Sequence, residues 1–204
     1  MTAVTEPAPP DHQASAPTGY TVVLPPGWSR IPLRRGTEQT ITRILDRSFA
    51  GLARDRVATL RHELRGRLRE LAERAREHGG LDLYVPTERM HGVTAAASFV
   101  VAEMSLDSAQ QGDPARLAAQ LLADDAHTTA VDVAATVATR AEYLVAADAE
   151  RGDGSRRVDY VLAVPGDLGR WVVVSFSTLG SGDLAQLLVE LFDAVMTTFR
   201  WRHR

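Results

Sequence analysis

Apolar residues recur at helical spacing early in the chain, and the spacing then changes to that of strands. The helical pattern starts with Ile41 and Ile44 and continues from Val57 to Ala75. Apolar positions three to four residues apart lie on one face of a helix. Gly51 divides the run and predicts two helices, and His78-Gly79-Gly80 predicts the end of the second.

Segments before and after this helical stretch have the apolar and β-branched pattern of strands. A first hairpin is predicted from Tyr20–Leu24 and Trp28–Leu33, with Pro25-Pro26-Gly27 as its turn. Further strands are predicted over Leu81–Val85, Thr94–Leu106, Thr128–Leu144 (one long or bent strand, with a helix as the alternative), Arg157–Val164 and Arg170–Thr178. The last two strands form a hairpin across Pro165-Gly166-Asp167.

Two more helices are indicated by their capping residues. Asp113-Pro114 is a typical helix start and predicts a helix to Asp124. Ser181 predicts the cap of a final helix. The apolar stripe of that helix consists of Leu184, Leu187, Leu188, Leu191, Val195 and Phe199.

Consecutive strands joined by short turns favour an antiparallel sheet. We therefore predict an α+β fold, an α-β-α sandwich around a mainly antiparallel sheet, with a long arginine-rich helical segment after the first hairpin. Residues 1–18 are rich in proline and predict a disordered tail, and residues 19–204 predict a single α+β domain.

Composition excludes several classes of chemistry. The 204 residues contain no cysteine, and all 23 basic residues are arginine. Disulfides, thiolate nucleophiles, Schiff-base lysines and P-loops are therefore excluded. A net charge of −3 and an isoelectric point near 6.1 argue against nucleic-acid binding. Residues 1–19 lack a secretory pattern and no apolar run is long enough for a transmembrane segment, so a cytoplasmic location is expected.

Residue spacing gives little support to catalysis. The six histidines include no His-x3-His pair, and we expect no metal and no cofactor, although His91 and His127 could meet across a sheet. Gly180-Ser181-Gly182-Asp183 is the one segment that suggests a serine nucleophile, with His127 as its base. A helix cap is expected at the same place, so a serine hydrolase is a distant alternative.

The helix predicted over Arg54–Glu77 has an unusual charge pattern. At about 100° per residue, arginines flank its apolar stripe and acidic residues occupy the far face. Arg61, Arg65, Arg69 and Arg76 lie on one flank and are candidate binding residues. Two interpretations remain open. The stripe packs on the sheet while arginine stems cover its margins, or the helix lies on an anionic membrane.

The three tryptophans are expected to have different roles. Trp28 and Trp171 are predicted to fill the core. Trp201 stands beside Arg200 and Arg202 after the last helix and is a candidate exposed binding anchor, with a position in the core as the alternative.

The segment Tyr20–Trp28, a strand followed by Pro-Pro-Gly-Trp, resembles the opening of the Mog1/PsbP/LpqN-like fold family. The order of the later strands and the C-terminal helix with Leu187, Leu191 and Phe192 are also similar. The arginine-rich helical segment departs from the compact family pattern. The resemblance implies an actinobacterial α-β-α sandwich with no catalytic site of its own. It also implies a role as an adaptor, assembly factor or cofactor of a larger complex, with a secretion or envelope system as one setting.

We therefore predict a non-enzymatic adaptor that binds a protein partner, whose identity the sequence leaves open together with the oligomeric state. The alternative is a lipid- or small-molecule-binding domain that uses the arginine-flanked helix, which includes peripheral contact with a membrane.

Overall fold

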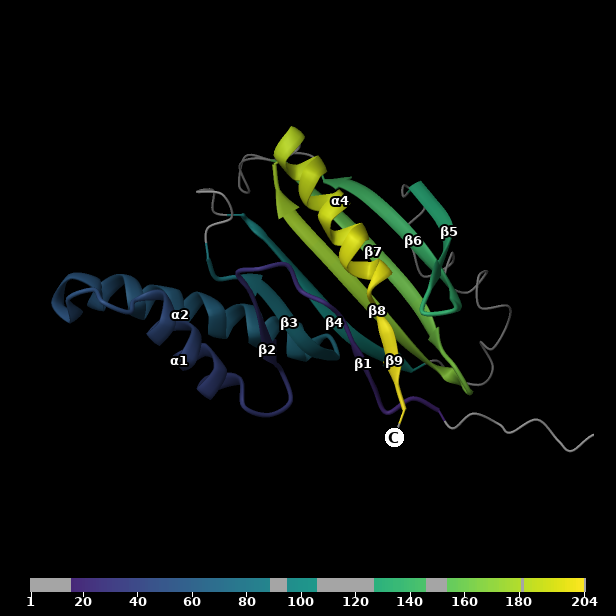
Figure 1. Cartoon of the computed structure of the whole chain (residues 1–204), viewed down its shortest axis with the longest axis horizontal. Coiled ribbons are helices and arrows are strands. Elements are labelled where there is room, and N and C mark those ends of the chain that lie inside the picture. Colours follow the sequence, from purple (N-terminus) through teal and green to yellow (C-terminus); the bar gives the residue numbers. More distant parts are fainter. Residues whose placement is uncertain (1–15, 89–94, 106–126, 146–153, 181, 204) are drawn as a thin grey trace, which may run out of the picture.

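The computed structural model describes residues 16–88, 95–105, 127–145, 154–180 and 182–203 (Figure 1). The elements within them, in chain order, are β1 (Gly19–Thr21), β2 (Trp28–Pro32), α1 (Thr37–Ser48), α2 (Arg54–Glu77), β3 (Gly80–Pro86), β4 (Ala97–Ser105), β5 (His127–Val133), β6 (Thr136–Val145), β7 (Ser155–Val164), β8 (Asp167–Leu179), α4 (Asp183–Thr197) and β9 (Arg200–Arg202). The helix predicted from Asp113 to Asp124 lies outside the described residues, as does Ser181.

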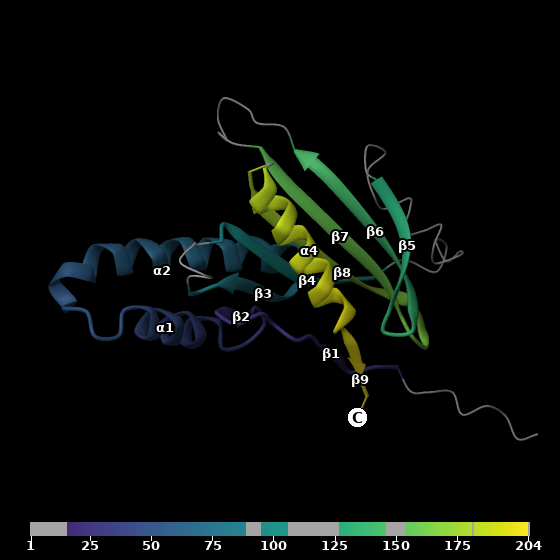
Figure 2. The same cartoon turned by 45° about the horizontal axis from the view of Figure 1, so that its top comes forward.

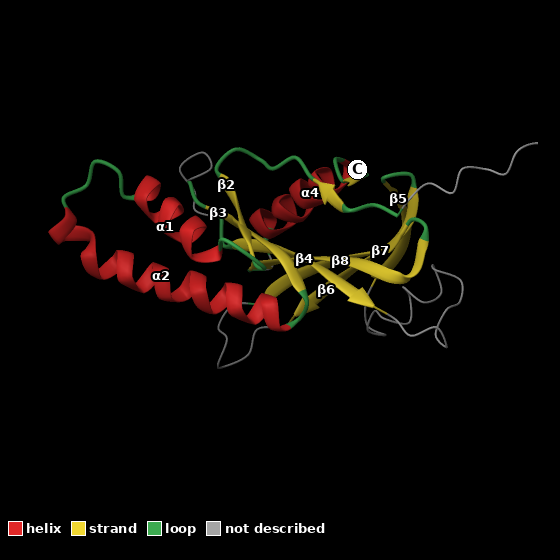
Figure 3. Ribbon diagram, turned by 90° about the horizontal axis from the view of Figure 1, so that it is seen from below, coloured by secondary structure: helices red, strands yellow, loops and turns green. Residues whose placement is uncertain are grey.

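Seven strands form one antiparallel sheet in the order β2-β3-β4-β8-β7-β6-β5, and β1 pairs with β9 in a separate two-stranded sheet. Figure 3 shows α4 on one face of the large sheet and the pair α1 and α2 on the other. The predicted α+β sandwich around an antiparallel sheet is therefore confirmed. The predicted break at Gly51 is also present, because α1 ends at Ser48 and α2 starts at Arg54.

The first hairpin is not formed as predicted. The backbone N–H of Trp28 donates to the carbonyl of Pro25 at 3.3 Å, so the turn exists. The strands on its two sides pair elsewhere, however, β1 with β9 and β2 with β3. Side chains favour this arrangement: Arg30 of β2 donates twice to Asp82 of β3, at 2.6 and 2.9 Å, and the hydroxyl of Tyr20 donates to the same carboxylate.

The segment Thr128–Leu144 is a hairpin and not one long strand. β5 and β6 pair in register from Val133–Thr136 to His127–Glu142. Ala134 and Ala135 form the turn with φ values of 53° and 58°, which match a type I′ turn. Alanine rarely adopts this left-handed conformation, so the sequence carries no local signal for the turn.

The two faces of the sheet carry separate cores. On β4, Phe99 and Val101 belong to the cluster beneath α4, while Val100 packs against the cluster beneath α1 and α2. Trp171 is 2% exposed, as predicted for a core residue. Trp28 is half-buried, and its ring centroid lies 5.7 Å from that of Phe99.

The buried face of α4 is rotated from the predicted stripe. Leu188 and Val195 are buried as expected, whereas Leu184 and Leu187 are 51% and 60% exposed. The buried positions are Ala185, Leu188, Val189, Phe192, Val195 and Met196. The rotation turns a polar edge of the helix toward β6 and β7, where arginines are available.

Candidate functional site

The helices α1 and α2 form an arm, defined here as residues 37–77. Both helices lie side by side and extend past the β2 edge of the sheet (Figures 1 and 2). At 1.5 Å per residue, the 12 residues of α1 span about 18 Å and the 24 residues of α2 about 36 Å. The longer helix therefore lacks a helical neighbour along part of its length.

The apolar stripe of α2 is covered only in part. Ala72 is 4% exposed, and Leu64, Leu68 and Ala75 pack partly against the cluster formed with α1 and β3. Leu60 and Leu71, at the edge of the stripe, are 50% and 43% exposed. The stripe thus packs on the rest of the chain, as one of the two interpretations predicted, and leaves an apolar edge uncovered.

Two of the candidate arginines form ion pairs with α1. Arg69 donates twice to Glu38, at 2.7 and 2.6 Å, and Arg61 donates to Asp46. Hydrogen bonds from Arg69 lower the pKa of Glu38 and in turn raise the pKa of Arg69. The fourth candidate, Arg76, pairs at 3.0 Å with Glu73 of its own helix. These pairs are largely exposed and contribute little stability.

Arg65 differs from its neighbours on the helix. It is half-buried, and in the part of the chain that the structure describes it forms no hydrogen bond or ion pair. Its charge contributes to the lowered pKa of Glu38, but that carboxylate is held by Arg69. Arg65 is therefore the candidate arginine whose hydrogen-bonding capacity is unused.

A crevice of about 650 Å³ lies where α1 turns into α2. We call it the tip crevice and define it by its lining residues Asp46, Phe49, Gly51, Leu52, Val57, Ala58, Arg61, His62 and Arg65. It combines an apolar wall with arginines from α2, and it contains two of the residues that the sequence singled out.

Trp201 lies apart from the arm, on β9, so the structure does not bring it together with the four arginines. It is half-buried, and its ring meets Phe199 edge-on with centroids 5.1 Å apart. Its indole Nε1 is enclosed and has no hydrogen-bond partner among the described residues. A role as an interface anchor would rest on the partly exposed ring.

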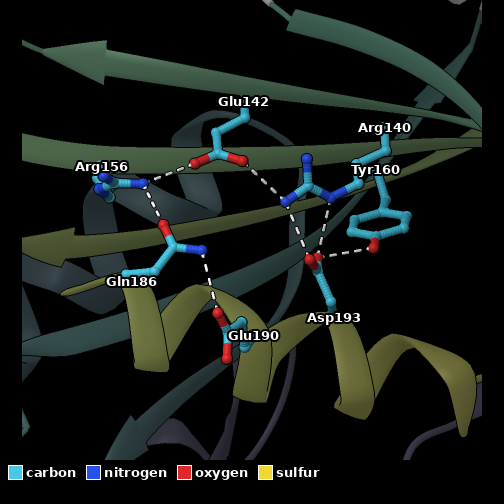
Figure 4. Close-up of polar contacts among 7 residues, drawn as sticks. All are labelled: Arg140, Glu142, Arg156, Tyr160, Gln186, Glu190 and Asp193. Atoms are coloured by element: carbon cyan, nitrogen blue, oxygen red, sulfur yellow. Dashed lines mark hydrogen bonds and ion pairs between the residues drawn. The ribbon is translucent and has the colours of Figure 1, made fainter. Parts of the chain in front are cut away.

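A second polar cluster, between α4 and the sheet, was not predicted (Figure 4). Arg140 of β6 donates to both oxygens of Asp193, at 3.0 and 2.9 Å, and Tyr160 of β7 donates to the same carboxylate at 2.8 Å. Burial alone would lower the pKa of Arg140, but its bonds to Asp193 raise it above its usual value. Burial and the bond to Asp193 raise the pKa of Tyr160.

The same cluster continues along α4. Arg156 donates to Glu142 at 3.0 Å and to Gln186 at 2.6 Å, and Gln186 donates to Glu190 at 3.2 Å. Most polar groups of the cluster are thus paired with one another. We assign it a structural role, which is to hold α4 on the sheet. Its members come from distant segments, so no local sequence signal was available to find them.

The distant catalytic alternatives gain no geometric support. Among the described residues, no three His, Cys, Asp or Glu side chains form a possible metal site. His127 lies on β5, three strands from β8, which precedes Ser181. Three strand spacings amount to about 14 Å. Ser181 and His91 themselves lie outside the described residues. No helix within the described ranges is long and apolar enough to cross a membrane.

No family model matches this chain, and no curated protein matches it. Among solved structures it is similar to the Ran-binding protein Mog1p of Saccharomyces cerevisiae. The identity is 11%, the match covers 60% of this chain and 79% of that chain, and the TM-score is 0.40. It is also similar to LpqN of Mycobacterium tuberculosis, which is involved in cell envelope biogenesis. The identity is 10%, the match covers 90% of this chain and 84% of that chain, and the TM-score is 0.46.

These two proteins are of the kinds that the sequence resemblance named. At such identities and TM-scores the likeness concerns the overall fold alone, and it assigns no partner, ligand or pathway to this chain.

Proposed function

We propose that this chain is a non-enzymatic protein-binding adaptor or assembly factor of a larger complex, and that the arm is the part that binds the partner. The observation that carries the proposal is the uncovered apolar edge of α2, where Leu60 and Leu71 are 50% and 43% exposed. An exposed apolar strip bordered by charged residues is typical of a protein-interaction surface.

The geometry of the arm supports this assignment. Leu60 and Leu71 are eleven residues apart, which is about three helical turns, so they lie on the same side of α2. Leu52, in the connection between the helices, is 57% exposed and extends the apolar surface toward the tip. The arm protrudes from the sheet, so a partner can contact it without meeting the body of the domain (Figure 2).

The lipid-binding alternative fits the arm less well. A helix that lies on a membrane needs its apolar face free, whereas Leu64, Leu68 and Ala72 already pack against the rest of the chain. Exposed acids, including Glu63 and Glu70, also stand on α2 and would repel anionic headgroups. The cytoplasmic location and the secretion or envelope setting belong to the proposal and rest on the sequence alone.

The test is affinity capture from an extract of the source organism with quantitative mass spectrometry. The double variant Leu60→Asp, Leu71→Asp is expected to lose the partner recovered with the wild type, because two carboxylates would have to be desolvated in the interface. Leu184→Asp is the matched control, since Leu184 is a similarly exposed leucine, 51%, on α4. Equal recovery with all three proteins, each shown to be folded by its thermal melt, would refute the arm as the binding element.

A further inference from the structure

The ion pairs between α1 and α2 follow a regular ladder in which one position is left open. On α1, Glu38 and Asp46 are eight residues apart, and on α2 their partners Arg69 and Arg61 have the same separation. Eight residues are about two helical turns, so both ends of the ladder are held by carboxylate–guanidinium pairs. The residue midway on α2 is Arg65.

The residue midway on α1 is Thr42, at the level of Arg65. A carboxylate at this position would continue the ladder, but threonine carries none. Arg65 is left half-buried with no hydrogen bond or ion pair within the described residues. A partly desolvated guanidinium is stabilised most by an anion that accepts hydrogen bonds from its parallel N–H groups, and a carboxylate has the matching geometry.

The surroundings of Arg65 further define the ligand. Arg65 lines the tip crevice, whose apolar wall is formed by Phe49, Leu52 and Val57. Leu52 is 57% exposed, so contact with an apolar side chain would remove additional surface from water. The crevice therefore presents one unused cation next to an apolar wall.

We propose that the tip crevice binds an acidic segment of the protein partner, in which an Asp or Glu carboxylate pairs with Arg65 and a neighbouring apolar side chain packs against Phe49 and Leu52. This inference rests on the proposed function and adds the chemistry of the partner. A lipid headgroup is disfavoured, because Leu64, Leu68 and Ala72 of α2 already pack against the rest of the chain and are not free to enter a bilayer beside the crevice.

The probe is a random-peptide phage library selected on the full chain. Enriched peptides are expected to carry Asp or Glu beside Leu, Phe or another apolar residue. Their affinity is then measured by fluorescence anisotropy for the wild type and for Arg65→Gln, and a loss of about tenfold is expected, the equivalent of about 1.4 kcal/mol. Arg47→Gln is the matched control, because Arg47 is an exposed arginine of the same arm outside the crevice, and it should leave affinity unchanged.

A second variant tests the open position directly. Thr42→Glu supplies the missing carboxylate from within the chain, so it should occupy Arg65 and weaken peptide binding about tenfold. Because glutamate is a better helix former than threonine, the thermal midpoint should stay unchanged or rise. A variant that loses binding without losing stability separates occupation of the crevice from unfolding.

Three results would overturn the inference. Enriched peptides without acidic residues, or no enrichment above background, would exclude an acidic ligand. Equal affinities for wild type, Arg65→Gln and Thr42→Glu would exclude Arg65 as its receptor. Arg65-dependent flotation with phosphatidylglycerol vesicles would assign the crevice to a membrane. The proposed function is tested separately by partner capture. If capture still depends on Leu60 and Leu71, any of these three results would refute the inference about the crevice and leave the adaptor function supported.

Discussion

The helix α4 and the arm cover opposite faces of the same sheet, but they are built differently. The 15-residue α4 buries six of its side chains. In the 24-residue α2, Ala72 is the one buried residue among those whose burial the structure describes. The charged groups differ in the same way. The side chain of Arg140, beneath α4, is 15% exposed, and that of Arg69, on the arm, is 51% exposed.

This difference separates a structural element from a candidate binding element. The polar groups beneath α4 are mostly paired and shielded, so they stabilise one arrangement of helix and sheet. The arm has screened ion pairs and an arginine, Arg65, that is unpaired among the described residues, and these charges cost little to leave in water and are available to a partner. Mutations should therefore affect stability at α4 and binding at the arm.

The largest expected effect on stability comes from the core beneath α4. Phe192 is 2% exposed and stacks on Phe176 with centroids 4.8 Å apart. Phe192→Ala should lower the free energy of unfolding by about 3–5 kcal/mol, because it leaves a cavity. Leu60→Ala on the arm should lower it by less than about 1 kcal/mol. Denaturant unfolding of both variants measures the contrast, and equal losses would contradict it.

A smaller effect is expected from the ion pairs on the two faces. Asp193→Ala leaves Arg140 and Tyr160 without their shared acceptor and should cost about 1–3 kcal/mol, allowing for the 35% exposure of Asp193. Glu38→Ala removes the exposed pair with Arg69 and should cost less than about 0.5 kcal/mol. Thermal melts of the two variants provide the comparison, which fails if Glu38→Ala proves as destabilising as Asp193→Ala.

Alkaline pH should lower the free energy of unfolding through tyrosines on the α4 side of the sheet, because the arm contains no tyrosine. Burial raises the pKa of Tyr84 to about 12 and raises the pKa values of Tyr20 and Tyr160 as well. The folded chain thus retains protons that the unfolded chain loses near pH 10, so stability is complete below that pH and falls above it.

Above pH 10 the free energy of unfolding should fall by more than about 1 kcal/mol per pH unit. Denaturant unfolding at several pH values above 10 measures this slope. Tyr160→Phe removes one of the three protons and should flatten the slope. A wild-type stability that does not change above pH 10 would show that these hydroxyls are not protected by the fold.

Features encoded by neighbouring residues were predicted correctly from the sequence. The helical periodicity of the arm, the break at Gly51 and the hairpin at Pro165-Gly166-Asp167 are all present. Each depends on periodicity or on turn residues within a few positions. The spacing of Glu38 and Asp46 against Arg61 and Arg69 was also available in the sequence as a hint of the ladder.

Pairings between distant segments were decided by the tertiary structure. Local rules joined Tyr20–Leu24 to Trp28–Leu33, but Asp82 binds both Tyr20 and Arg30, and β1 pairs with the far C-terminal β9. The turn at Ala134 and Ala135 has no sequence signature, because its left-handed backbone is imposed by the two strands that it joins.

The candidate site shows the same division. Periodicity and charge in the sequence singled out the arginines of α2, because the flanks of a stripe follow from helical geometry alone. The packing of α1 against α2 decided which of these arginines are paired. It also left Arg65 without a partner among the described residues, beside an apolar crevice. The physical reason is that residue types along one helix determine its faces, whereas the charge left unneutralised depends on which other helix packs against them.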